Sequence, residues 1–163
     1  MPPADLFTPD DVRVELACFE LEGTLYALEV TQVLEIVRCP PLVRLPHAPA
    51  LIEGVVDLRG VVLPIVDLGR ALGGAPTSDP ERARIAVLKV DDLVFGLRVT
   101  AAVDVLALPV AQVEGLPRLA AQAGYEAVRA VVRRSGARPV LVLSLEALLE
   151  RVYRSAGAPE EAA

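Results

Sequence analysis

The sequence predicts a mainly β fold in which two lobes of about five strands each form small closed barrels, with short helices and a C-terminal helix. Short segments rich in Val, Leu and Ile are separated by turn residues at nearly regular intervals, which is typical of barrels and sandwiches. Hydrophobic residues make up 53% of the chain but aromatic residues only 4%, which favours a core of aliphatic strands. A segment near the N-terminus also recurs near the middle of the chain, which indicates two similar lobes.

The chain opens with a predicted β-hairpin. Apolar residues alternate over residues 12–18, and the alternation changes parity after Cys18, which predicts a strand that contains a bulge. Glu22 and Gly23 predict a tight turn, because glycine tolerates the positive φ that such turns require. Residues 25–30 then form the returning strand.

A second hairpin follows a proline-rich connection. Residues 51–56 and 61–68 are predicted strands, and residues 57–60 form the turn between them. Pro64 has no N–H to donate to a neighbouring strand, so we expect it at a sheet edge or a bulge.

The second lobe repeats this pattern. Residues 83–90 and 93–99 are predicted strands joined by a turn at Asp91 and Asp92. Tyr26 matches Phe95, 69 positions later, and the similarity runs through Thr31 and Thr100. Because strands return after gaps without helical periodicity, we expect antiparallel pairing. The duplication predicts lobe 1 over about residues 21–75 and lobe 2 over about residues 83–143.

The C-terminal part contains a second repeat and a predicted helix. Residues 61–68 resemble residues 138–145, and each segment leads into a short leucine-bearing helical stretch. Ser144 is a suitable N-cap for a helix over residues 145–154, in which apolar residues share one face. We expect a single domain over residues 12–154, completed by N- and C-terminal segments, with flexible tails at residues 1–11 and 155–163.

Charge and cysteine content narrow the classes of function. The net charge of −6 repels phosphate backbones and anionic lipids, so we expect no nucleic-acid partner. The sequence shows no export signal and no apolar stretch of membrane-spanning length, so we expect no direct membrane insertion. Cys18 and Cys39 lack a C-x-x-C spacing and are read as small buried hydrophobic residues, which fits a reducing cytoplasm.

The inventory of catalytic groups is thin. His47 is the only histidine, and no partner for acid–base chemistry is identifiable, so we expect it on a loop. The sequence has no phosphate-binding glycine motif and no plausible metal set, so we expect no cofactor and no enzymatic activity. A small hydrolase using Glu53 and Asp67 is a remote alternative, although acidic residues at strand ends are usually solvated.

The stretch from Gly54 to Gly60, followed by residues 63–68, resembles the signature of the CheW family of chemotaxis coupling proteins. The resemblance extends from about Val14 to Tyr153. It implies two five-stranded SH3-like β-barrel lobes packed together, in agreement with the duplication.

The family resemblance also implies a function. CheW-like proteins are non-enzymatic adaptors that couple the cytoplasmic tip of methyl-accepting chemoreceptors to the regulatory domain of the histidine kinase CheA. A chain with this role is cytoplasmic and is recruited to membrane-associated receptor arrays. An adaptor of a non-flagellar chemosensory pathway, such as one for type IV pili or development, is the alternative of the same fold.

The resemblance places protein-binding roles on six positions of this chain: Val33, Glu35, Ile36, Gly54, Asp57 and Arg59. Two positions depart from the family pattern, because Asp57 stands where Asn is usual and Thr100 where Asp is common. From spacing alone, Arg59 is a turn arginine that pairs with Asp57, and such a pair would compete with the carboxylate of a partner.

Overall fold

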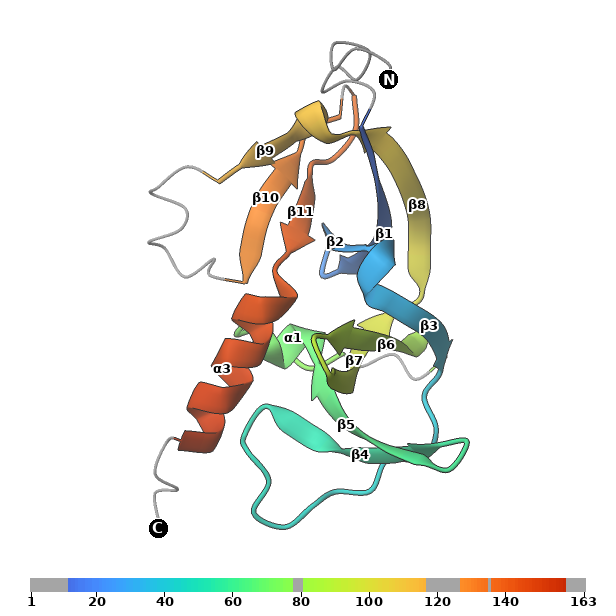
Figure 1. Cartoon of the computed structure of the whole chain (residues 1–163), viewed down its shortest axis with the longest axis vertical. Helices are drawn as coiled ribbons and strands as arrows, with labels where there is room; N and C mark the ends of the chain where they lie inside the picture. The colour runs from blue at the N-terminus through green and yellow to red at the C-terminus, as the bar shows by residue number, and fades with distance from the viewer. Residues whose placement is uncertain (1–11, 78–80, 117–126, 135, 158–163) are drawn as a thin grey trace, which may run out of the picture. The chain divides into compact units, whose positions relative to one another are not determined.

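The computed structural model describes residues 12–77, 81–116, 127–134 and 136–157 (Figure 1). Strands predominate and form two sheets, which confirms the predicted mainly β class. The chain divides into two compact units, and each unit takes residues from both halves of the sequence. Unit 1 comprises residues 1–31 and 102–143, and unit 2 comprises residues 32–101 and 144–163.

Unit 1 contains a six-stranded sheet in the order β8-β1-β2-β11-β10-β9. Its strands are β1 (Arg13–Leu21), β2 (Thr24–Glu29), β8 (Ala102–Pro109), β9 (Val113–Gly115), β10 (Val128–Val132) and β11 (Val140–Leu143). A 3₁₀ turn, η4 (Val110–Gln112), links β8 to β9. Small and aliphatic side chains from five of these strands, among them Leu16 and Val142, form its core.

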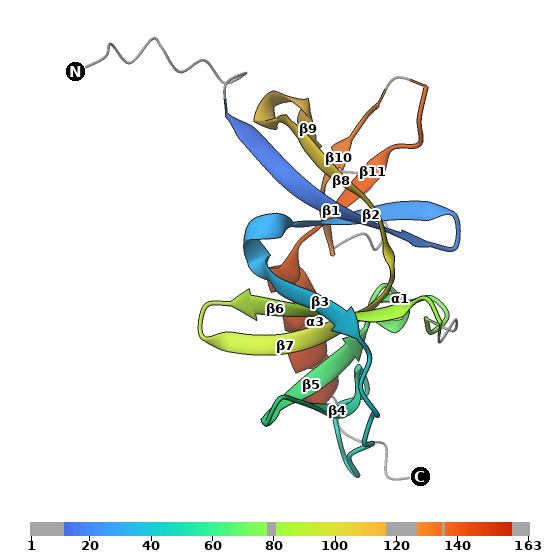
Figure 2. The same ribbon diagram turned by 90° about the vertical axis from the view of Figure 1, so that its right-hand side faces the viewer.

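Unit 2 contains a five-stranded sheet in the order β3-β6-β7-β5-β4 (Figure 2). Its strands are β3 (Val33–Arg38), β4 (Ile52–Leu58), β5 (Val61–Asp67), β6 (Ala83–Val90) and β7 (Leu93–Thr100). The helices α1 (Leu68–Ala71) and α3 (Leu145–Gly157) also belong to this unit and contact each other. The core is built from β4, β5 and β6, with Ile65 and Ile85 fully buried.

The two sheets repeat one strand order, which agrees with the duplication in the sequence. In unit 1 the parallel ladder between β2 and β11 pairs Ala27 with Val142. In unit 2 the parallel ladder between β7 and β5 pairs Gly96, the repeat equivalent of Ala27, with Ile65. Corresponding strands therefore meet in the same register in both units.

The units are not the contiguous lobes that the sequence predicted over residues 21–75 and 83–143. β3 leaves β1 and β2 and pairs with β6, while β8 leaves β6 and β7 and pairs with β1. Only η3 (Val30–Gln32) separates β2 from β3, and only Ala101 separates β7 from β8. For β3 to lie beside β1 it would have to run parallel to β2, which needs a crossover connection of about a dozen residues. The short connections therefore direct each third strand into the other unit.

Other local predictions have mixed outcomes. The register of β1 against β8 shifts between Cys18 and Phe19, which confirms the predicted bulge. Glu22 and Gly23 have φ values of 50° and 81°, as the predicted tight turn requires. Pro64 lies on an interior strand rather than an edge, just before the segment of β5 that pairs with β7. The two parallel ladders also correct the expectation of antiparallel pairing throughout.

The C-terminal helix confirms its predicted start. The Ser144 hydroxyl accepts a hydrogen bond from the backbone N–H of Ala147 at 3.2 Å, as an N-cap does. Leu145, Leu148 and Val152 form its buried face. The helix continues to Gly157, into the segment predicted as a tail, whereas residues 1–11 and 158–163 lie outside the described residues.

Candidate protein-binding site

The six predicted binding residues all belong to unit 2 and lie on two strands and one turn. Val33, Glu35 and Ile36 are on β3, at one edge of the sheet. Gly54 and Asp57 are on β4 at the other edge, and Arg59 is in the turn that joins β4 to β5. The predicted residues therefore lie at opposite edges of the sheet, and they form one surface only if the sheet brings those edges together.

An ion pair joins the two edges. The Arg59 guanidinium contacts the Glu35 carboxylate, and the side chains are 69% and 32% exposed, respectively. The sheet of unit 2 therefore curls until the β4–β5 turn reaches β3. This contact corrects the expected pair between Arg59 and Asp57, because Arg59 reaches across the sheet instead of along the turn.

Asp57 has a structural task in the same turn. Its Oδ1 accepts a hydrogen bond from the backbone N–H of Gly60 at 2.8 Å. Arg59 and Gly60 both have positive φ, at 51° and 84°, as the two central residues of a tight hairpin turn require. An Asn side chain accepts the same bond with its carbonyl oxygen, so Asp57 preserves the turn despite departing from the family's Asn.

We expect Asp57→Asn to change the free energy of unfolding by less than about 0.5 kcal/mol, because the acceptor for the Gly60 N–H remains. Asp57→Ala removes the acceptor and is expected to cost about 1 kcal/mol. Urea denaturation of both variants beside the wild type measures the difference. Equal losses in the two variants would show that the charge, not the hydrogen bond, stabilises the turn.

Gly54 is buried, so it does not lie on the exposed surface of unit 2. A Cβ added at this position would lie 2.4 Å from the backbone oxygen of Val43. Val43 exchanges two backbone hydrogen bonds with Val55, of 2.9 and 2.8 Å, which hold the segment before β4 against that strand. Gly54 therefore permits this close approach, since it has no side chain at that point.

Exposed aliphatic residues are the sequence neighbours of the ion-paired residues. Burial alternates along β3, so Leu34 and Ile36 project from the face of the strand opposite to that of Glu35, and Leu34 is 57% exposed. Val33 is half-buried, opposite Leu88 on β6. We define the β3 edge surface by the exposed aliphatic residues and the ion pair: Leu34, Glu35, Ile36, Arg59, Val61 and Val62.

Sequence reasoning missed three members of this surface. Leu34, Val61 and Val62 were not among the predicted binding residues, although Val62 is 64% exposed. The pair of valines directly after a turn was the available signal, since an alternating strand places only one of two neighbours inside. Exposed aliphatic residues around a charged pair are typical of a protein-interaction surface.

The carboxylates of the hydrolase alternative are engaged elsewhere. Asp67 is 1% exposed, not solvated as expected, and its oxygens accept hydrogen bonds from the backbone N–H groups of Arg70 and Thr77. Glu53 forms an ion pair with Arg98 at 2.5 Å, in which both side chains are largely buried. Both carboxylates are thus engaged in contacts within the fold.

The described residues were also searched for a histidine site, a metal site and a membrane-spanning helix. His47 lies exposed on the connection before β4, with a φ of 63°. Within the described ranges, no group of three His, Cys, Asp or Glu side chains is placed to hold a metal ion. In the same part of the chain, none of the helices has both the length and the apolar character needed to cross a bilayer.

Both cysteines are free thiols, and their burial differs. Cys18 is buried in the core of unit 1, as predicted, whereas Cys39 is only half-buried after β3. Desolvation raises the pKa of both thiols, and for Cys39 the Arg98 guanidinium partly offsets this effect. Both are therefore held in the neutral thiol form, which is a poor nucleophile.

Comparison with known proteins finds a matching family model and relatives of similar sequence. The family model described as the CheW-like domain matches residues 15–153. The chain is 31% identical to a probable chemotaxis protein CheW of Rhizobium etli, with 87% of this chain and 91% of the relative covered. Protein FrzA of Myxococcus xanthus is 30% identical, with 87% and 89% covered.

A solved structure shows the same fold. The crystal structure of the scaffolding protein TtCheW from Thermoanaerobacter tengcongensis superimposes with a TM-score of 0.75. It shares 23% sequence identity, and the match covers 84% of this chain and 88% of that protein. From the family model that spans nearly all described strands, and from relatives matched over most of their length, this chain belongs to the CheW-like domain family.

Proposed function

We propose that this chain is a non-enzymatic adaptor that couples methyl-accepting chemoreceptors to the histidine kinase CheA. The observation that carries the proposal is the exposed ion pair between Glu35 and Arg59, together with the exposed aliphatic residues next to it in the sequence, on the β3 edge surface. Membership of the CheW-like domain family supports it, as do relatives named for chemotaxis and for scaffolding.

The chemistry of the β3 edge surface suits a helical partner. The cytoplasmic tip of a chemoreceptor is a helical hairpin, and such a helix docks by laying its apolar face against aliphatic side chains. Leu34 and Ile36 offer these contacts on one strand, and Val61 and Val62 offer them beside the turn. The charges of Glu35 and Arg59 then fix the orientation of the partner, since polar groups contribute specificity more than affinity.

The predicted binding residues take two roles in this proposal. Glu35, Ile36 and Arg59 are solvent-accessible and contact the partner. Val33, Gly54 and Asp57 hold β3, β4 and the turn in place beneath that surface. The regulatory domain of CheA binds as the second partner, and the adaptor acts in the cytoplasm, where it is recruited to membrane-associated receptor arrays.

We expect Arg59→Glu to abolish or strongly weaken binding to a receptor-tip fragment in a pull-down. The substitution places two carboxylates in contact and reverses the charge presented to the partner. The pair is exposed, so the free energy of unfolding is expected to change by no more than about 1 kcal/mol. The wild type is expected to retain both the receptor tip and the CheA regulatory domain.

A charge swap and a matched control sharpen this test. The double variant Glu35→Arg with Arg59→Glu restores attraction within the chain but not the charge pattern, so binding is expected to stay weak. Arg133→Glu disrupts a comparable exposed pair, with Glu114 in unit 1, and serves as the control. A wild type that binds neither partner contradicts the adaptor role, and normal binding by Arg59→Glu contradicts the site.

The pathway is a separate question, and an adaptor of a non-flagellar system is the second candidate. Similarity to Protein FrzA, which does not carry the chemotaxis name of the other relatives, favours keeping it. The kinase and receptor genes beside the gene for this chain distinguish the two. Neighbouring flagellar genes support the first candidate, and neighbouring pilus or developmental genes support the second.

A further inference from the structure

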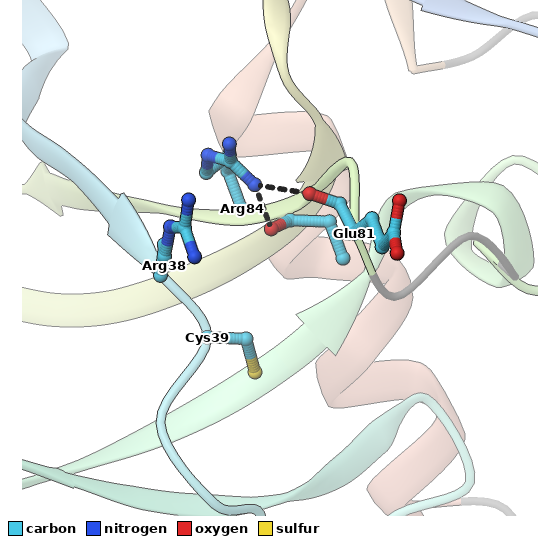
Figure 3. Close-up of a pocket in the computed structure, with 5 residues that line it drawn as sticks. Arg38, Cys39, Glu81 and Arg84 are labelled. Atoms are coloured by element: carbon cyan, nitrogen blue, oxygen red, sulfur yellow. Dashed lines mark hydrogen bonds between the residues drawn. The ribbon is translucent and has the colours of Figure 1, made fainter.

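A cavity of about 580 Å³ opens in unit 2 where β3 ends and β6 begins (Figure 3). Two arginines line it, together with one thiol and one acidic residue: Arg38, Cys39, Glu81, Ala83 and Arg84. None of these residues belongs to the β3 edge surface. The cavity is a concentration of positive charge on a chain whose net charge is −6.

The two arginines are opposite each other in the β3–β6 ladder, and Glu81 is the only acidic residue among the described residues that line the cavity. Arg38 is paired with Arg84 in the antiparallel register, and like charges directly opposite each other are unfavourable. In Figure 3 the Glu81 carboxylate points away from both guanidinium groups. Arg38 has no hydrogen-bond or ion-pair partner among the described residues.

Arg84 is held in place by the main chain. Its Nη1 donates hydrogen bonds to the backbone oxygens of Glu81 and Ala83, both at 2.9 Å. The other donors of the guanidinium have no partner among the described residues, and its position is fixed before any ligand arrives. Two guanidinium groups, one of them pre-organised, form a suitable receptor for an oxyanion, and for a carboxylate in particular.

The position of Arg38 on β3 indicates which molecule supplies such a carboxylate. Arg38 is exposed and has the same strand parity as Leu34 and Ile36, so the three side chains project from one face of β3. Leu34 and Arg38 are four positions apart on an extended strand, a distance of about 13 Å. A partner helix that lies along β3 spans this distance with side chains about two to three turns apart.

We propose that the cavity between Arg38 and Arg84 receives a carboxylate side chain of the protein partner that binds the β3 edge surface. The proposal rests on the proposed function, because it assumes a partner on that surface. It adds a second, acidic contact on the partner, about 13 Å from the apolar anchor near Leu34. The contact relieves the repulsion between the two arginines and favours partners with an acidic residue at that spacing.

The test compares charge-reversed variants of the full chain by calorimetric titration with a receptor-tip fragment and with the CheA regulatory domain. Arg38→Glu is expected to weaken the affinity for the receptor-tip fragment, the partner on the β3 edge surface, about tenfold or more, as loss of a charge-assisted contact does. Arg38→Lys is expected to lose less, because the charge stays while the paired donors are lost. Both variants are expected to fold, since Arg38 is exposed and without a partner among the described residues.

Arg70→Glu is the matched control. Arg70 is exposed on α1, its guanidinium has no partner in the described part of the chain, and the substitution changes the net charge equally. An affinity loss for Arg38→Glu but not for Arg70→Glu supports the proposal. Equal affinities of Arg38→Glu and wild type, with weak binding by Arg59→Glu, overturn it while the proposed function stands. A wild type that binds neither partner overturns both.

A second experiment uses inorganic phosphate to test whether the cavity binds a free small oxyanion. One outcome is that phosphate stabilises the wild type against heat but not Arg38→Glu, while both bind the protein partners equally. That result would make the cavity a site for a free small oxyanion and would overturn the proposal. If phosphate instead competes with the partner for the wild type only, the shared oxyanion chemistry of the cavity is supported.

Discussion

Gly54→Ala is expected to lower the free energy of unfolding by about 2 to 3 kcal/mol, as overpacking of a close contact does. The added Cβ would lie 2.4 Å from the backbone oxygen of Val43 and 3.1 Å from the Leu42 side chain. Relief requires residues 42–43 to move away from β4, which breaks the two hydrogen bonds between Val43 and Val55. Denaturant unfolding measures the loss.

Gly115→Ala is the control for this substitution. Gly115 also lies in a strand, its φ is not positive, and a Cβ there would meet nothing within 4 Å. Its replacement is expected to be neutral or slightly stabilising, because alanine has less conformational freedom in the unfolded chain. If Gly54→Ala and Gly115→Ala are equally stable, the backbone at Val43 yields easily and Gly54 has no packing role.

Asp67→Ala is expected to cost about 2 to 4 kcal/mol, because it removes a buried acceptor from two backbone N–H groups. The carboxylate accepts from Arg70 N at 3.0 Å, at the start of α1, and from the buried Thr77 N at 3.0 and 3.2 Å. Asp67 thereby joins a helix start to a segment ten residues later. Thermal and urea unfolding report the loss.

The repeat supplies a graded comparison for Asp67. Ser144 occupies the equivalent position before α3, but its hydroxyl accepts from a single backbone N–H, that of Ala147. Ser144→Ala is therefore expected to cost about 1 kcal/mol, the usual value of an N-cap. Asp67→Asn keeps one acceptor oxygen and should fall between the two. An Asp67→Ala loss no larger than that of Ser144→Ala would contradict the bridging role.

Local features of the fold were predictable because local chemistry decides them. The turn at Glu22 and Gly23, the bulge after Cys18 and the cap at Ser144 depend on residues within a few positions of each other. Asp67 was the exception among the local assignments. Its position at a strand end suggested solvation. In the structure, however, Asp67 is buried and accepts a hydrogen bond from the backbone N–H of Thr77.

The candidate site was less accessible to sequence reasoning. Spacing alone paired Arg59 with Asp57, its near neighbour, whereas the structure pairs Arg59 with Glu35, 24 positions away. The positive φ at Arg59 and the hydrogen bond from Gly60 to Asp57 orient the turn so that these neighbours do not pair. Only the family resemblance put Glu35 and Arg59 in one site, because no local pattern relates them.

From the sequence alone, the hairpin strands, their turns and the duplication were predictable, since alternation of apolar residues and turn chemistry are short-range properties. Strands β3, β8, β9 and β10 were not among the predicted strands. The tertiary structure alone decided which copy of the repeat each strand joins. Equivalent strands carry the same apolar pattern, so they fit either sheet, and the brevity of the β2–β3 and β7–β8 connections directs the exchange. The tertiary structure also brought Glu35 to Arg59, because their contact depends on how far the whole sheet curls.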